Sequence, residues 1–197
     1  MRKYLSLTIV LGVLCSSVGV SGSGLGLGQQ ARETEEYSVY EVLLKERFIN
    51  RQIKRLVIAR DTSIDEDSYA DLDEALKGAD PLTKDAVKDF RAKRNTERLR
   101  DHFLVPVEVI LLSPKQIARI FKHSSGNKDG WQVFSQNYPA SAGLITLSRV
   151  GFNPDKTQAL VFVAHTCGLL CGEGNYFVLT KKDGEWKIVK EMVTWVS

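Results

Sequence analysis

The carboxyl-terminal part of the chain holds four apolar, β-type runs separated by short turns, and this pattern constrains the fold most. The runs cover residues 144–152, 158–166, 175–181 and 186–196. The first two are joined by Asn153-Pro154-Asp155-Lys156, with proline where a type I turn favours it. The last two are joined by Lys182-Asp183-Gly184-Glu185, and Asp-Gly is typical of a hairpin. Neighbouring runs with tight turns predict a four-stranded antiparallel meander.

Helical patterns precede these runs. From Glu35 onward, apolar residues recur at spacings of three and four, which predicts an amphipathic helix. Asp80-Pro81 and Ser113-Pro114 are typical helix starts, and 131–138 is a further short helical segment. The segments 55–59 and 103–112 look extended. Helices gathered before a meander predict an α+β fold, with the helices packed on the sheet.

The run 158–166 is apolar on both faces of the expected sheet. Val161 and Val163 point one way, whereas Leu160 and Phe162 point the other way. A strand of this kind needs cover on both sides. The preceding helices supply one cover, and the amino-terminal helix, sheet curvature or a partner must supply the second.

The amino terminus has the features of a secretory signal peptide over residues 1–22. Arg2 and Lys3 precede the apolar run 5–14, and small residues follow from Ser16. The run is shorter than the roughly 20 apolar residues that a membrane-spanning helix needs. We therefore expect an exported protein, periplasmic or extracellular, with no membrane span after cleavage.

Two regions follow the expected signal peptide. Residues 23–34 are glycine-rich at their start and predict a flexible leader, and 35–197 form a single α+β domain. An alternative to cleavage is a lipid anchor on Cys15. Leu14 argues against the anchor, because a lipobox has a small residue just before its cysteine.

The charge of the chain argues against nucleic acid as a partner. The chain has 27 Lys and Arg against 24 Asp and Glu, and cleavage would remove Arg2 and Lys3. A nearly balanced chain lacks the strong positive charge that phosphate backbones attract. The segment 91–101 has mixed charges at helical spacing and predicts a water-facing surface, with a partner-binding basic stripe as the minor alternative.

Cys167 and Cys171 would be the cysteines left after cleavage, and we predict a disulfide between them. Two thiols this close in the sequence of an exported protein most simply oxidise to a disulfide that closes a small loop. A redox-active pair remains an alternative. So does a zinc site with His165, but four ligands would then require His102 or His123, and no metal or cofactor is expected.

A cysteine nucleophile with His165 as its base is the enzymatic interpretation of the same residues. Two residues apart on one strand, His165 and Cys167 would point to the same face. We identify no third residue that would orient the base. His165 is therefore better explained as a partly buried histidine at the sheet margin.

Arg149 stands out because it alternates with Ile145 and Leu147 on an apolar stripe. A buried arginine needs an acidic or carbonyl partner, and a structural ion pair is the default interpretation. The functional alternative is that Arg149 binds the carboxylate of a ligand in a pocket lined by the sheet.

Several stretches resemble a group of uncharacterised exported bacterial proteins. They are Ser148-Arg149-Val150-Gly151-Phe152-Asn153, the glycine-rich turn 167–174, and the ending Gly184-Glu185-Trp186-Lys187-Ile188. The resemblance covers 131–197, and 37–63 more loosely, and it implies no activity. The order of helices and sheet is also similar to cystatin-like and nuclear-transport-factor-like folds, which host many unrelated functions.

Together these features favour an exported, non-catalytic domain that binds a small ligand or an envelope protein. Arg149 and His165 are the candidate ligand contacts, and no catalytic residue is assigned. The alternatives are an envelope thiol-redox protein or hydrolase that uses Cys167, Cys171 and His165, and a structural accessory protein.

Overall fold

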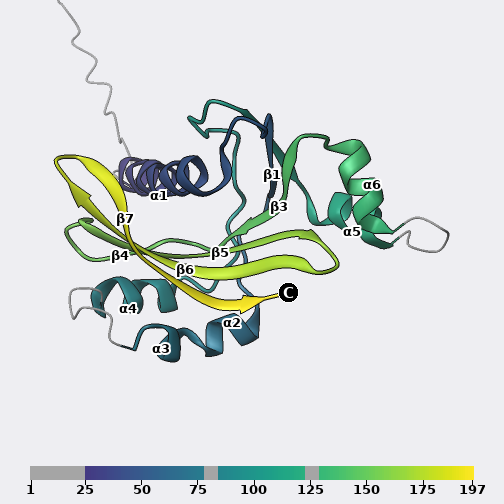
Figure 1. The fold of residues 1–197 in the computed structure, drawn as a ribbon. Helices are drawn as coiled ribbons and strands as arrows, with labels where there is room; N and C mark the ends of the chain where they lie inside the picture. The colour runs from purple at the N-terminus through teal and green to yellow at the C-terminus, as the bar shows by residue number, and fades with distance from the viewer. Residues whose placement is uncertain (1–24, 78–83, 123–128) are drawn as a thin grey trace, which may run out of the picture.

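The computed structural model describes residues 25–77, 84–122 and 129–197, which form an α+β protein around one mixed sheet (Figure 1). The described helices are α1 (Leu25–Phe48), α2 (Glu66–Ala70), α3 (Leu72–Ala75), α4 (Lys84–Ala92), α5 (Pro114–Lys122) and α6 (Gly130–Asn137). The described strands are β1 (Arg55–Ala59), β2 (Glu108–Leu112), β3 (Ser141–Leu147), β4 (Gly151–Phe152), β5 (Gln158–Gly168), β6 (Cys171–Lys182) and β7 (Glu185–Val196).

The sheet is larger than the sequence predicts, and it contains strands of both directions. Among the described residues it has seven strands in the order β2-β1-β3-β5-β6-β7, with β4 paired to β5. β1 pairs in parallel with both β2 and β3, whereas β3, β5, β6 and β7 pair antiparallel. The expected sheet of four antiparallel strands therefore has to be corrected to a seven-stranded mixed sheet. Pairing between strands far apart in sequence leaves no turn signature, so the pattern of turns does not reveal β1 and β2.

The two faces of the sheet are covered by different helices. Figure 1 shows α1 along one face and α2, α3 and α4 along the other. Val161 is buried with Tyr40 and Leu43 of α1 in the larger apolar cluster. Phe162 is buried with Phe90 of α4 in the second cluster. The amino-terminal helix thus gives β5 the second cover that its two apolar faces require.

A third apolar cluster packs α5 and α6, which lie between β2 and β3 in the sequence, against the sheet. Val57 of β1 and Leu112 of β2 are buried against Ile120 of α5 and Phe134 of α6. Asp129 caps α6, because its carboxylate accepts a hydrogen bond from the backbone N–H of Trp131.

Two boundaries differ from the expected ones. α1 begins at Leu25, before the expected start at Glu35, so it includes residues that the sequence assigns to a flexible leader. The run 144–152 is not one strand, because residues 148–150 separate β3 from β4. The signal peptide over 1–22, Cys15, the helix start at Asp80-Pro81 and His123 lie outside the described residues. In the part that is described, no helix is long and apolar enough to cross a membrane.

Candidate functional site

A pocket of about 170 Å³ opens beyond the carboxyl ends of β1 and β3. Thr62 and Ser63 follow β1, and Ser148 and Arg149 follow β3. β2 and β3 flank β1 on opposite sides in the parallel part of the sheet. In open sheets with parallel strands, ligands bind outside the carboxyl ends of the strands, at the point where the strand order reverses. The remaining lining residues are Ile64, Glu66, Tyr69, Phe90, Lys93, Arg94, Asn95 and Thr96.

Hydrogen bonds of Ser148 fix the short segment between β3 and β4 that includes Arg149. The hydroxyl of Tyr40 donates to the Ser148 carbonyl oxygen at 2.8 Å. The Ser148 hydroxyl accepts from the backbone N–H of Phe162 and donates to the Arg149 carbonyl oxygen, both at 2.8 Å. Burial, together with the nearby charge of Glu36, raises the pKa of the Tyr40 hydroxyl well above its ordinary value, so this donor keeps its proton.

The Arg149 guanidinium is held between two carboxylates from distant parts of the chain. Its Nη2 lies 3.0 Å from Oε1 of Glu36, and its Nη1 lies 3.2 Å from Oε2 of Glu97. The Glu36 side chain is only 8% exposed, whereas that of Glu97 is 50% exposed. Burial by itself lowers the pKa of Arg149, but the hydrogen bonds and charge of Glu36 outweigh it and raise that pKa, so Arg149 stays charged.

Lys93 forms a second cationic group at the pocket, just after α4. Its Nζ lies 2.7 Å from Oδ2 of Asp89, donates to the Val150 carbonyl oxygen at 2.7 Å, and lies 3.6 Å from Oε1 of Glu36. The cluster therefore ties α1, α4 and the β3–β4 junction together at the rim of the sheet. The acidic partners of Lys93 and Arg149 largely compensate the charges of both cations.

Arg94 is the third cation of the pocket, and its environment differs from that of the other two. Its guanidinium carbon lies 4.4 Å from the centre of the Tyr69 ring, as in a cation–π contact. The Tyr69 ring in turn stacks near Phe90, with ring centres 6.5 Å apart. Arg94 is exposed, and no carboxylate of the described residues lies within ion-pair distance of it. Arg94 thus offers an uncompensated positive charge beside two aromatic rings.

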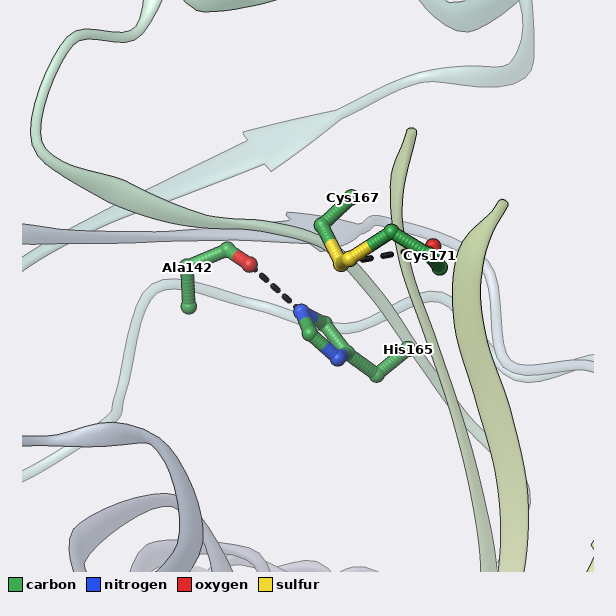
Figure 2. The surroundings of a disulfide bond; sticks show 4 residues. All are labelled: Ala142, His165, Cys167 and Cys171. Atoms are coloured by element: carbon green, nitrogen blue, oxygen red, sulfur yellow. Dashed lines mark hydrogen bonds between the residues drawn. A yellow bond between two sulfur atoms is a disulfide. The ribbon is translucent and has the colours of Figure 1, made fainter. Parts of the chain in front are cut away.

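His165 does not line this pocket. Figure 2 shows its imidazole directed at the carbonyl oxygen of Ala142, which lies 2.5 Å from Nε2 and accepts a hydrogen bond from it. The other side of the ring meets Phe48 of α1, with ring centres 5.2 Å apart. The two candidate ligand contacts, Arg149 and His165, therefore do not belong to one site.

Cys167 and Cys171 form a disulfide across the turn between β5 and β6 (Figure 2). Their Cα atoms are 5.1 Å apart, within the range that a disulfide needs. Cys167 is half-buried and Cys171 is exposed. No group of three or more His, Cys, Asp or Glu side chains in the described ranges is arranged to hold a metal ion. The ring of His102 packs against Tyr37 instead, with ring centres 6.0 Å apart.

Removing this disulfide is expected to reduce stability without changing the fold. The constraint that a short closed loop places on the unfolded chain corresponds to about 2 kcal/mol. The variant Cys167→Ser/Cys171→Ser should therefore unfold at lower urea concentration than the oxidised protein, and the reduced wild type should match the variant. Equal midpoints for all three proteins would contradict a structural disulfide.

Lys93, Arg94 and Tyr69 were not predicted as site residues. The charged stretch 91–101 is largely exposed, as expected, but α4 ends at Ala92, and Lys93 and Arg94 line the pocket. The sequence contains one signal for Arg149, its place on an apolar stripe. It contains none for the contact between Arg94 and Tyr69, which depends on how α2 and α4 pack.

Comparison with protein-family models, with curated proteins and with solved structures finds no match for this chain. The expected resemblance to exported bacterial proteins and to cystatin-like folds therefore stays a prediction. The function has to be argued from the geometry of the site.

Proposed function

We propose that this protein is an exported, non-catalytic domain that binds a small carboxylate in the pocket beyond the carboxyl ends of β1 and β3. The proposal rests on the environment of Arg94. Its guanidinium lies over the Tyr69 ring and has no acidic partner among the described residues. A carboxylate accepts two parallel hydrogen bonds from a guanidinium, which is the strongest polar contact such a pocket offers.

The other lining residues favour the same class of ligand. The charges of Lys93 and Arg149 are paired with those of Asp89, Glu36 and Glu97, so Arg94 supplies the uncompensated positive charge of the pocket. Hydroxyl and amide groups are available from Ser63, Asn95 and Thr96. The rings of Tyr69 and Phe90, with Ile64, form an apolar wall. A small acid with a planar or apolar body would match this combination.

A binding role is favoured over catalysis by the state of the nucleophilic groups. The Ser148 hydroxyl already accepts a hydrogen bond from Phe162 N and donates one to Arg149 O, and no described histidine or cysteine lines the pocket. His165 is bonded to a backbone carbonyl, and the two cysteine sulfurs are joined to each other. Nucleophilic catalysis needs an activated nucleophile with a base in reach, and these groups do not form that pair.

Export is supported by two independent features. The first is the signal-peptide pattern over 1–22, and the second is the disulfide, because oxidising compartments are where disulfides persist. A thiol-redox protein is the alternative with one observation in its favour, the exposure of Cys171.

Benzoate is a suitable probe for the proposed pocket because it combines a carboxylate with a planar apolar ring. We expect isothermal titration calorimetry to show binding of benzoate to the wild type and at least tenfold weaker binding to Arg94→Gln. Tenfold corresponds to about 1.4 kcal/mol, close to the lower limit for a hydrogen bond to a charged group. Arg51→Gln, which removes an exposed arginine outside the pocket, is the matched control and should bind like the wild type. Unchanged affinity in Arg94→Gln, or no binding by the wild type, would contradict the proposal.

A further inference from the structure

β2 lies at one edge of the sheet, and among the described strands it pairs with β1 alone. The backbone N–H of Glu108 donates to the Lys54 carbonyl oxygen at 3.2 Å, and the Arg60 N–H donates to the Leu112 carbonyl oxygen at 2.8 Å. Glu108 and Leu112 thus turn their backbone groups toward β1. Because alternate residues of a ladder face opposite sides, Val109 and Leu111 turn theirs away from β1, to the open edge.

The described part of the β2 edge has neither the bulges nor the lysines that protect many edge strands. β7, at the opposite edge, is interrupted by two register shifts against β6 and carries Lys187 and Lys190. Bulges and lysines of this kind prevent unwanted pairing. β2 has the sequence EVILL, with an uninterrupted register against β1 and no lysine or proline. Its central residues, 109–111, are only half-buried.

A pocket of about 250 Å³ lies directly beside this edge. It is lined by Val109 and Leu111 of β2, together with Arg60, Arg98, Leu99, Arg100 and Asp101. The pocket takes positive charge from Arg60 and Arg98, and Asp101 is the one carboxylate among the described residues that line it. It is separate from the carboxylate pocket, since the two share no lining residue.

Backbone bonds hold the arginines of this pocket in place. The Leu99 N–H donates to the Arg60 carbonyl oxygen at 2.8 Å, and Asp61 and Arg98 form an antiparallel bridge. The side chain of Arg60 reaches along the edge, and its Nη2 donates to the outward carbonyl oxygen of Leu111 at 3.3 Å. The Arg98 side chain is 78% exposed and lies 3.7 Å from Asp61, a pair that contributes little.

From these observations we propose that the β2 edge binds an extended acidic segment of a partner protein. The segment adds as a further strand beside residues 109–111, and a glutamate or aspartate side chain enters the pocket beside Arg60 and Arg98. Backbone hydrogen bonds to an open edge provide affinity, and a side-chain pocket beside the edge provides specificity. The Leu111 carbonyl oxygen has two lone pairs, so it can accept from the added strand while it still accepts from Arg60.

Fluorescence anisotropy with synthetic peptides tests this proposal. The probe is a fluorescein-labelled peptide of alternating valine and glutamate, and its counterpart has lysine in place of glutamate. We expect saturable binding of the acidic peptide and none of the basic one. Arg60→Gln/Arg98→Gln should weaken binding of the acidic peptide at least tenfold. Arg94→Gln, in the carboxylate pocket, should leave it unchanged.

A second variant separates strand addition from simple charge attraction. Val109→Pro removes an outward N–H and no bond to β1, so proline is tolerable at this edge position. Circular dichroism should show a native fold, while binding of the acidic peptide falls at least tenfold. Undiminished binding to Val109→Pro would mean attraction to surface charge only and would overturn the proposal. So would failure of the acidic peptide to bind the wild type, or equal binding of the basic peptide.

Discussion

Arg149→Met is expected to lower the free energy of unfolding by about 3 kcal/mol in urea denaturation at neutral pH. The substitution leaves the Glu36 carboxylate in a site where its side chain is only 8% exposed. Breaking one partner of a buried ion pair costs about 3–5 kcal/mol, because the remaining charge is uncompensated. The lower end applies here, since Lys93 Nζ still lies 3.6 Å from Glu36 Oε1.

The double variant Glu36→Leu/Arg149→Met is the control for this experiment. Removing both charges leaves no buried charge without a partner at this site, and such replacements are often neutral or stabilising. Lys93 keeps its pair with Asp89. We therefore expect the double variant to be within about 1 kcal/mol of the wild type. A single variant as stable as the wild type would show that Glu36 does not depend on Arg149.

Gly151→Ala is expected to have an effect of similar size, with a loss of about 3 kcal/mol in the free energy of unfolding. The added β-carbon would overlap the carbonyl oxygen of Ala86 and lie 2.5 Å from the backbone N of Phe90. Both are backbone atoms of α4, so the helix itself must move. Because Phe90 and Lys93 line the carboxylate pocket, benzoate binding should fall as well.

Gly168→Ala provides a matched control in the same sheet. Its added β-carbon would meet only Cys171 Cβ, at an ordinary contact distance of 3.4 Å. We expect unfolding by urea within about 0.5 kcal/mol of the wild type, as for most substitutions without a specific clash. Equal losses in Gly151→Ala and Gly168→Ala would contradict the close approach of α4 to β4.

The sequence predicts the parts of this fold that depend on local patterns. The alternation of apolar residues in β5 requires cover on both faces, and the structure provides α1 for Val161 and α4 for Phe162. The parallel pairing of β1 with β2 and β3 is not predictable in this way. Those contacts join residues such as Arg55 and Glu108, and no turn between them records the pairing.

In the candidate site, too, the sequence predicts some features, and others depend on how the chain folds. An arginine on an apolar stripe predicts that Arg149 needs an acidic partner, but Glu36 becomes that partner only once α1 lies on the sheet. Arg94 carries no such signal, because an exposed arginine after a helix is ordinary. Its significance comes from the Tyr69 ring that α2 places beneath it.

Amide chemical shifts report whether the pocket beyond β1 and β3 binds a small carboxylate. We would titrate ¹⁵N-labelled protein with benzoate and follow its ¹H–¹⁵N correlation spectrum. We expect saturable shifts centred on the residues that line the pocket, including Ser63 and Arg149 after the strand ends and Arg94 and Asn95 after α4. Saturable shifts centred elsewhere, or no shifts at millimolar benzoate, would contradict the proposal.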